Sequence, residues 1–389
     1  MCGRGCCAVL VLGISLLAYM LSPVVLRLYN QAQVTVPSDQ KTPQALRIGI
    51  LGAADIAPSA LIWPVGKRKD VVVVAVAARS MEKARTYAQK HGIPKVLESY
   101  EALISDPEID AIYNPLPNGL HWKWTEQALK AGKHVLCEKP MASNAREAYA
   151  MQQAATKAKR VLMEAFHYRF HPAAKRLEQI VRSGELGKLE HIETRGELPW
   201  NFAPESDIRF NVGGSDSRLA GGALMDIGCY AVNCFRLLAG EEPTVVNATA
   251  TETFPGVDGV FEAHLSLSGG GTGKITASMK KPLLVAEPPF VFRGLVIGEK
   301  ATLFIENFIV PFIYHYIEIV PRNGSQKRNE KVYDTGATSY EYQLDAFVDA
   351  VRGLRDLHVA GTPEDAVKNM ALIDQMYSAA GLQPREGYA

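Results

Sequence analysis

Between residues 46 and 166, short apolar runs alternate with helix-like stretches. The apolar runs, rich in Val, Ile and Leu, are LRIGILG, DVVVVAVAARS, IDAIYNPLP, KHVLCEKP and RVLMEAF. The segments between them include MEKARTYAQKHG, HWKWTEQALKAG and SNAREAYAMQQAATKAK. Continuous apolar strands divided by helices are typical of a parallel sheet that is covered on both faces. The pattern therefore predicts a parallel α/β domain over residues 45–168.

The pattern changes after about residue 189. Apolar and polar residues now alternate strictly in residues 261–267 and 275–279. Such alternation indicates strands with one face packed on the core and one face exposed to solvent, as in an antiparallel sheet. The glycines between the two strands predict a hairpin turn. An apolar stripe at helical spacing predicts a packing helix near the C-terminus; its members are Tyr340, Leu344, Phe347, Val348 and Val351. Residues 169–389 are thus expected to form an α+β domain with a large, mostly antiparallel sheet.

The start of the chain is apolar. No charged residue occurs from Gly5 to Leu26, which is about the ~20 residues that a helix needs to cross a bilayer. We predict an N-terminal transmembrane helix in a membrane anchor over residues 1–28 and a polar linker over residues 29–44. The expected location is a membrane, with a single-pass anchor. The alternative is a signal peptide that is cleaved to release a secreted protein.

Charge and cysteine content narrow the possible partners. The 389 residues carry a formal net charge of +1, and no run of Lys and Arg resembles a nucleic-acid footprint. No cysteine or histidine spacing indicates zinc, so no metal site is predicted. Cys137, Cys229 and Cys234 lie in apolar surroundings and are expected to be buried reduced thiols.

The first predicted strand runs into the turn Gly52-Ala53-Ala54-Asp55-Ile56-Ala57. Compared with the dinucleotide pattern G-x-G-x-x-G, its third and sixth positions are alanine. The turn joins a strand to a helix, where backbone N–H groups and the helix dipole favour a phosphate. The residues alone leave two interpretations open, a cofactor turn and a plain strand–helix connection.

The second predicted strand ends at Arg79-Ser80 and has no carboxylate there. NAD-binding folds of this type place an acidic residue at that point to hold the ribose 2′-OH. A guanidinium can instead pair with a 2′-phosphate. We therefore expect NADP rather than NAD, the alternative being that Arg79 is only a solvated charge.

The fourth apolar run ends at Glu138-Lys139-Pro140. Ligands of open α/β sheets bind beyond the carboxyl ends of the strands, and proline cannot extend the strand. Lys139 is then held at the mouth of a cleft beside Glu138. An ion pair that simply ends a strand is the alternative.

Several motifs together resemble the glucose–fructose oxidoreductase/inositol dehydrogenase (Gfo/Idh/MocA) family. They are GILGAADIA, NPLPNGLH, EKP, MEAFHYRFHP and DIGCY, in that order. The resemblance covers about residues 45–385 and is strongest to the dimeric dihydrodiol dehydrogenases and the NADP-dependent D-xylose 1-dehydrogenases. It implies a Rossmann domain, NADP as cofactor and a sugar or diol substrate. It also suggests a homodimer formed through the antiparallel sheet.

The resemblance also implies roles for individual residues. Lys139, Tyr230 and Asp226 match catalytic positions, with Tyr230 as acid/base, and Arg169 and Asp226 match substrate positions. The positions that match cofactor contacts are Gly52, Ala53, Ala54, Ile56, Arg79, Ser80, Pro115, Leu116, Asn118, His121, Glu138 and Lys139.

The expected chemistry is oxidation of a D-xylose-like aldose to a lactone. An i,i+4 spacing would place Asp226 and Tyr230 on one helix face. A neighbouring Lys139 ammonium would favour the tyrosinate of Tyr230, which could then take the proton from the sugar hydroxyl. The alternatives are a trans-1,2-dihydrobenzene-1,2-diol dehydrogenase and an NADP(H)-binding membrane-tethered sensor without turnover. A metal site at His167 and His171 is disfavoured because Pro172 follows at once.

Overall fold

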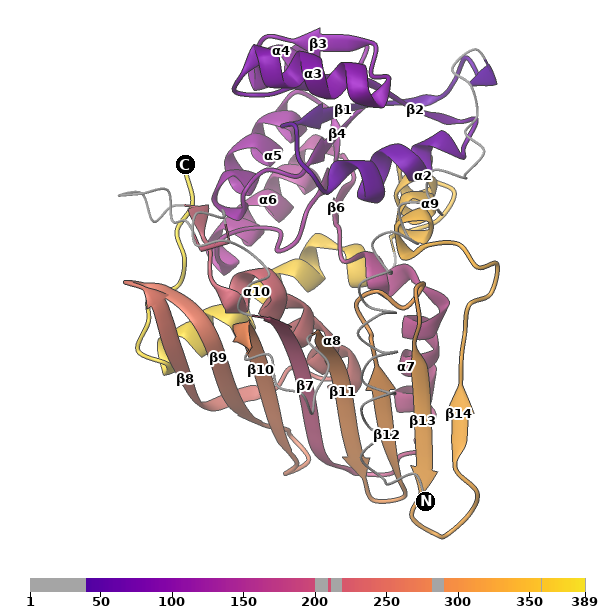
Figure 1. Cartoon of the computed structure of the whole chain (residues 1–389), viewed down its shortest axis with the longest axis vertical. Helices are drawn as coiled ribbons and strands as arrows, with labels where there is room; N and C mark the ends of the chain where they lie inside the picture. Colours follow the sequence, from indigo (N-terminus) through magenta and orange to yellow (C-terminus); the bar gives the residue numbers. More distant parts are fainter. Residues whose placement is uncertain (1–39, 200–208, 211–218, 282–289, 358, 389) are drawn as a thin grey trace, which may run out of the picture.

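The computed structural model describes residues 40–199, 209–210, 219–281, 290–357 and 359–388. Two sheets, one above the other in Figure 1, organise these residues into two domains. The upper sheet is parallel and the lower one is mixed, so both predicted sheet types are found.

The upper sheet contains the five predicted strands and one more, in the order β3-β2-β1-β4-β5-β6. The additional strand, β3, is three residues long, too short for a periodic pattern to reveal. The strands are β1 (Leu46–Leu51), β2 (Val71–Ala77), β3 (Lys95–Leu97), β4 (Ala111–Asn114), β5 (His134–Cys137) and β6 (Leu162–Glu164).

Helices cover both faces of this sheet, which explains why its strands are apolar throughout. On one face, Leu61 and Val65 share a core with Ile48, and on the other, Leu129 and Met151 share a core with Val135. The helices of this domain are η2 (Pro58–Ile62), α2 (Trp63–Gly66), α3 (Met81–His91), α4 (Tyr100–Ser105), η3 (Asn118–Leu120), α5 (His121–Lys130) and α6 (Ala145–Ala158).

The lower sheet has the strand order β14-β13-β12-β11-β7-β10-β9-β8. All its neighbours are antiparallel except β7 and β10, and the predicted hairpin joins β9 to β10. Its strands are β7 (Leu189–Pro199), β8 (Thr244–Phe254), β9 (Val257–Ser266), β10 (Thr272–Lys281), β11 (Val291–Gly298), β12 (Ala301–Glu306), β13 (Tyr316–Pro321) and β14 (Arg328–Glu330).

The helices after β6 connect the two domains. Phe347 and Val348 of α9 share a core with Ile48 of β1, so α9 packs on the first domain beside α2 (Figure 1). The predicted apolar stripe is therefore a packing face. The helices are η4 (His167–Phe170), α7 (Pro172–Arg182), η6 (Leu224–Gly228), α8 (Cys229–Ala239), α9 (Ser339–Val351), η7 (Val359–Gly361) and α10 (Pro363–Ala379). The boundary predicted between residues 168 and 169 falls inside η4 and stays a prediction.

The membrane anchor requires a correction. No helix within the described ranges combines the length and the apolar character needed to cross a bilayer. The predictions of a transmembrane helix and of a membrane location are therefore wrong on this finding. They were placed on residues 1–28, which lie outside the described part of the chain, as does most of the predicted linker.

Candidate active site

The turn after β1 has the backbone shape that a dinucleotide turn needs. Gly52 has φ +85°, and a Cβ atom there would lie 3.0 Å from Cδ2 of Leu116. The left-handed backbone conformation therefore favours glycine here, and a side chain would also press on Leu116. Ala53 and Ala54 follow in a partly exposed stretch, and the Ala54 carbonyl accepts a hydrogen bond from the Tyr87 hydroxyl (3.0 Å). Ile56 is 38% exposed, which is unusual for a large apolar side chain at the start of a helix.

Arg79 and Ser80 lie at the carboxyl end of β2. The Arg79 side chain is exposed, and its guanidinium forms no hydrogen bond or ion pair with the described residues. Ser80 caps α3, its hydroxyl accepting from the backbone N–H of Lys83 (3.3 Å). An unpaired guanidinium beside a helix N-terminus is a suitable environment for a phosphate.

The loop after β4 carries four predicted cofactor residues. Pro115 and Leu116 are buried, and the Asn118 amide donates to the carbonyl of Ala220 in the second domain (3.0 Å). His121 is fully buried, and its ring nitrogens lie 2.9 Å from the carbonyl oxygen of Pro140 and 2.6 Å from that of Leu116. Burial lowers the His121 pKa to about 4. His121 thus links this loop to the Glu138–Pro140 segment, and both of its ring nitrogens face backbone carbonyl oxygens.

The Glu138-Lys139-Pro140 segment follows β5 directly, at the carboxyl end of the sheet. Glu138 accepts a hydrogen bond from the buried Tyr113 hydroxyl of β4 (2.7 Å). Burial raises the pKa of Glu138, although that hydrogen bond and Lys139 oppose the rise. The peptide bond between Lys139 and Pro140 is cis. Glu138 therefore fixes the segment from the strand side and leaves Lys139 directed across the domain junction.

Lys139 contacts the second domain through Asp226. Its Nζ donates to the backbone carbonyl of Asp226 (2.8 Å) and lies 3.4 Å from the Oδ1 atom. The other carboxylate oxygen of Asp226 lies 3.0 Å from Nε of Arg209. Burial acts to lower the Lys139 pKa, but Asp226, Cys229 and Glu138 together outweigh it and the pKa is raised. Lys139 is therefore a fixed ammonium ion at neutral pH.

Tyr230 lies beside this ammonium. Nζ of Lys139 is 4.7 Å from the centre of the Tyr230 ring, within the range of a cation–π contact. Tyr230 is 6% exposed, and its hydroxyl forms no hydrogen bond with any described residue. Burial, with further contributions from Tyr340 and Glu138, raises its pKa well above the ordinary value. Burial thus opposes the lysine-stabilised tyrosinate that was expected, because it disfavours the anion.

The helix that carries Asp226 and Tyr230 differs from the predicted one. It begins as a π-helix, η6, and continues as α8 from Cys229. The hydrogen bond of a π turn runs from residue i to residue i+5, so the helix is not a regular α-helix at Asp226, although Lys139 contacts both Asp226 and Tyr230. Gly228 permits the close approach of η6 to the sheet, because a Cβ atom there would lie 2.8 Å from that of Ala277.

His167 adjoins Tyr230 and packs on Tyr340, and neither residue was assigned to the site from the sequence. The His167 ring centre lies 5.9 Å from that of Tyr230 and 4.1 Å from that of Tyr340 on α9. Nδ1 of His167 is 2.7 Å from the Ser339 hydroxyl. Burial and the nearby Lys139 lower the His167 pKa to about 3, so the ring is neutral. The spacing of His167 and His171 had suggested only a metal site.

Arg169, a predicted substrate residue, lies in η4 and contacts the helix α8. It is buried, and its Nη1 donates to the side-chain oxygen of Asn233 (3.1 Å). The Tyr168 hydroxyl donates to the same oxygen (2.6 Å). The structure thus brings Lys139, Asp226 and Tyr230 together, whereas its Arg169 contacts are with Asn233. The predicted buried thiols are confirmed at Cys137, Cys229 and Cys234.

Glu164 ends β6 and is fully buried. One carboxyl oxygen accepts from the backbone N–H of Met141 (2.7 Å), and the other, Oε2, has no partner among the described residues. Burial raises its pKa to about 8. A neutral carboxyl group therefore holds the chain just beyond Pro140.

We predict a pH-dependent effect of Glu164→Gln on stability. Between about pH 4.3, where the unfolded carboxyl ionises, and about pH 8, the folded wild type keeps a proton that the unfolded chain has lost. This part of the wild-type stability is therefore lost as pH rises through that window, and the variant avoids the loss. Thermal unfolding at about pH 5 and about pH 8.5 should show a smaller fall in Tm for the variant. Glu98→Gln, at an exposed site, is the control; equal falls in all three proteins would contradict the buried neutral carboxyl.

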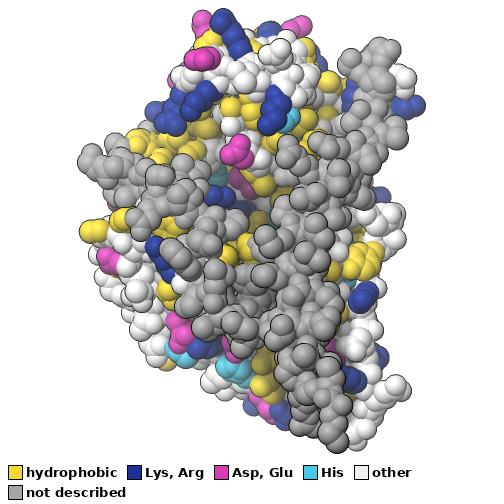
Figure 2. Space-filling model, in the orientation of Figure 1, with side chains coloured by type: hydrophobic (Ala, Val, Ile, Leu, Met, Phe, Trp, Pro, Cys, Tyr) yellow, Lys and Arg dark blue, Asp and Glu magenta, His cyan; other side chains and the backbone are white. Residues whose placement is uncertain are grey.

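Figure 2 shows charged side chains of both signs in a hollow between the two domains. The phosphate-type turn, Arg79, Lys139 and Tyr230 all belong to elements that end toward this junction. A fixed ammonium, a buried phenol with an unused hydroxyl and a glycine turn are together suited to hold a dinucleotide and to exchange a proton with a bound hydroxyl or carbonyl compound.

Comparison with known proteins agrees with this arrangement. Two family models match, one described as "Oxidoreductase family, NAD-binding Rossmann fold" (residues 46–166) and the other as "GFO/IDH/MocA C-terminal domain" (residues 174–304). A D-xylose 1-dehydrogenase (NADP(+)) from Haloferax volcanii is 40% identical over 61% of this chain and 70% of its own. A trans-1,2-dihydrobenzene-1,2-diol dehydrogenase from Xenopus laevis is 35% identical over 62% of this chain and 68% of its own.

Solved structures are similar over most of the chain. A 3-ketoreductase from Actinomadura kijaniata, in complex with NADP and TDP-benzene, has a TM-score of 0.76 at 26% identity, covering 89% of this chain and 99% of its own. An aldose-aldose oxidoreductase from Caulobacter crescentus has a TM-score of 0.75 at 27% identity, covering 87% and 98%. The resemblance inferred from the motifs is thereby confirmed, and this chain belongs to the Gfo/Idh/MocA family of oxidoreductases.

Proposed function

We propose that this oxidoreductase uses NADP to oxidise a hydroxyl group of a D-xylose-like aldose, giving a lactone. The observation that carries the proposal is the contact between the Lys139 ammonium and the Tyr230 ring at the carboxyl end of β5. Similarity to an NADP-dependent xylose dehydrogenase and to a structure in complex with NADP supports the substrate class and the cofactor.

The residues of the first domain fit a nicotinamide dinucleotide. Gly52, in its left-handed conformation, allows the backbone to approach a pyrophosphate, and Ala53, Ala54 and Ile56 continue the same turn. Arg79 would pair with the 2′-phosphate that distinguishes NADP from NAD. When bound, the nicotinamide accepts the hydride.

The side chains at the domain junction would control the transfer of the proton of the sugar hydroxyl. Tyr230 is the only one of the three predicted catalytic residues that can exchange a proton with a sugar hydroxyl, because Lys139 and Asp226 are paired with each other. Its raised pKa makes the free enzyme's phenol a proton donor, which is the form needed for carbonyl reduction. Oxidation requires that the phenol first lose its proton to solvent, so that the phenolate can then accept the proton of the sugar hydroxyl while the hydride goes to the nicotinamide. The positive charge of Lys139 would stabilise the resulting anion.

Two other functions remain in competition. Similarity to dihydrodiol dehydrogenases supports oxidation of a trans-dihydrodiol to a catechol at the same residues. A binding protein without turnover would not need the hydroxyl of Tyr230. The Tyr230 hydroxyl forms no hydrogen bond with the described residues and is therefore available to a bound substrate, which favours an enzyme over a sensor.

The direct experiment is an assay of NADPH formation by absorbance. The purified protein is offered NADP⁺ or NAD⁺ with D-xylose, D-glucose or a trans-dihydrodiol. We expect turnover with NADP⁺ and an aldose. Turnover of the dihydrodiol alone would establish the second function, and cofactor binding without any turnover would establish the sensor.

A homodimer is a further part of this proposal. Helices α8 and α10 cover one face of the eight-stranded sheet, and the opposite face carries partly buried side chains such as Phe304 and Tyr316, whose ring centres are 5.7 Å apart. We propose that a second copy covers that face.

A further inference from the structure

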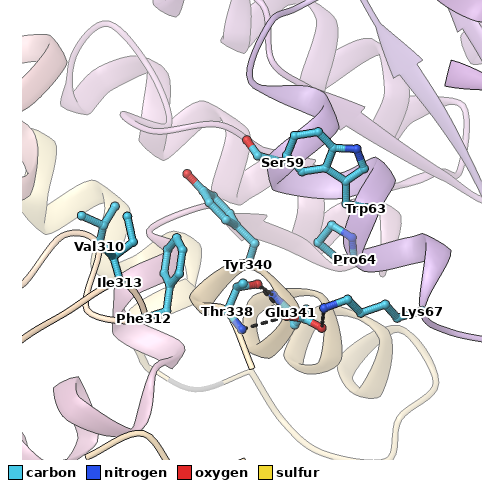
Figure 3. Close-up of a pocket in the computed structure, with 10 residues that line it drawn as sticks. All are labelled: Ser59, Trp63, Pro64, Lys67, Val310, Phe312, Ile313, Thr338, Tyr340 and Glu341. Carbon is cyan, nitrogen blue, oxygen red and sulfur yellow. Dashed lines mark hydrogen bonds and ion pairs between the residues drawn. The ribbon is translucent and has the colours of Figure 1, made fainter. Parts of the chain in front are cut away.

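A pocket at the domain junction is connected to Tyr230 through the packed rings of Tyr340 and His167. It is lined by Trp63 and Pro64 from α2, by Phe312 and Ile313 from the segment between β12 and β13, and by Tyr340 from α9. In Figure 3 the Tyr340 ring lies between Trp63 on one side and Phe312 on the other. The ring centres of Phe312 and Tyr340 are 6.2 Å apart. The pocket is therefore walled by aromatic and aliphatic side chains from both domains.

Tyr340 connects this pocket to the catalytic residues. Its ring packs against His167 at 4.1 Å, and the His167 ring contacts that of Tyr230. Tyr340 is close enough to Tyr230 to contribute to its raised pKa, whereas burial and Glu138 raise the pKa of Tyr340. A molecule with one end at Tyr230 could thus place its other end against Tyr340.

Apart from the Tyr340 hydroxyl, which has no hydrogen bond with the described residues, the polar side chains of the pocket are bonded within the protein. The carboxylate of Glu341 pairs with Lys67 (2.6 Å) and accepts from the Thr338 hydroxyl (2.9 Å). The Ser59 hydroxyl donates to the carbonyl of Ile56 (3.0 Å). These groups have little left to offer the several hydroxyls of a second sugar ring. Removing such hydroxyls from water without replacing their hydrogen bonds would be costly, so the pocket favours an apolar group.

We propose that this pocket binds an apolar, ring-sized part of the substrate, on the side remote from the carbon that is oxidised. The inference rests on the proposed function, because it assigns the pocket to the substrate of that reaction. The substrate class is then a sugar or cyclic diol that carries an aryl or comparable apolar substituent. Burying such a ring would contribute about 1.5–3 kcal/mol, or roughly 10- to 100-fold in affinity.

Two substrates and two variants test the proposal. D-xylose and 4-O-benzyl-D-xylose are compared in the wild type, in Trp63→Leu and in the control Trp122→Leu, which changes a tryptophan of α5 outside the pocket. We expect the benzyl compound to have the higher kcat/KM in the wild type and the control. Trp63→Leu should lose about tenfold of that advantage and keep its activity on D-xylose. An equal preference in all three proteins, or none in the wild type, would overturn the proposal.

A binding measurement separates this proposal from the proposed function. Saturation-transfer NMR with benzyl alcohol reports occupancy of the pocket whether or not the protein turns over a sugar. We expect a signal in the wild type and in Trp122→Leu that is strongly reduced in Trp63→Leu. If NADP⁺ displaces the benzyl alcohol, or if Trp63→Leu weakens NADP⁺ binding, the pocket belongs to the cofactor and the proposal fails.

Discussion

Replacing Tyr230 by phenylalanine should lower kcat by roughly 10²–10⁴-fold, the usual contribution of a positioned acid or base. The substitution removes one oxygen atom that has no hydrogen-bond partner among the described residues. It keeps the aromatic ring and its contact with the Lys139 ammonium. The fold and the affinity for NADP⁺ should therefore change little. Steady-state kinetics together with a titration of NADP⁺ binding would measure both quantities.

The matched control is Tyr149→Phe, the same change at an exposed tyrosine of α6. It should have wild-type kcat. If Tyr230→Phe also kept its kcat, the proton would have to be transferred by another group, and the assigned role of Tyr230 would be wrong. A large fall in KM with little change in kcat would instead indicate that the hydroxyl hinders substrate binding.

Replacing Arg79 by alanine should weaken NADP⁺ binding by on the order of 10- to 100-fold and leave NAD⁺ binding nearly unchanged. The guanidinium is exposed and has no hydrogen bond or ion pair within the described residues, so its removal costs no internal contact. A charge-assisted hydrogen bond of the kind it would make to a phosphate is worth about 1.5–3 kcal/mol. Dissociation constants for both cofactors, measured at one ionic strength, give the comparison.

Arg85→Ala serves as the control, because it removes the same charge from the exposed surface of the neighbouring helix α3. Its effect on NADP⁺ should be small and should disappear with added salt, as expected for a screened charge. Equal losses of NADP⁺ and NAD⁺ affinity in Arg79→Ala would show that Arg79 contacts a part that both cofactors share.

The strands of the first domain could be predicted because each is apolar over its whole length and is followed by a helix. The alternation in β9 and β10 likewise predicted a sheet with one packed face. Local pattern could not reveal that β10 lies parallel to β7, because that pairing joins strands about 80 residues apart. It also could not reveal the π-helix before Cys229 or the close packing of Gly228 against Ala277, because that contact joins residues far apart in the sequence.

Part of the site could be predicted because the carboxyl ends of parallel strands meet at one edge of the sheet. Lys139 follows β5, so its place at the edge of the sheet followed from topology. The ionisation state of Tyr230 did not, because it depends on how deeply the second domain buries the phenol. His167 and Tyr340 were missed for a related reason: they meet only when α9 folds back on the first domain. The sequence offered one signal for this contact, which was the position of Tyr340 at the start of the apolar stripe in α9.

The central claim is that this chain transfers hydride from a sugar carbon to NADP⁺ at the Lys139–Tyr230 junction. D-Xylose deuterated at C1 tests it most directly, with the NADPH product examined by NMR. The account predicts that deuterium appears at C4 of the nicotinamide in the wild type and that Tyr230→Phe forms this product far more slowly. NADPH without deuterium, or equal rates in both proteins, would contradict it.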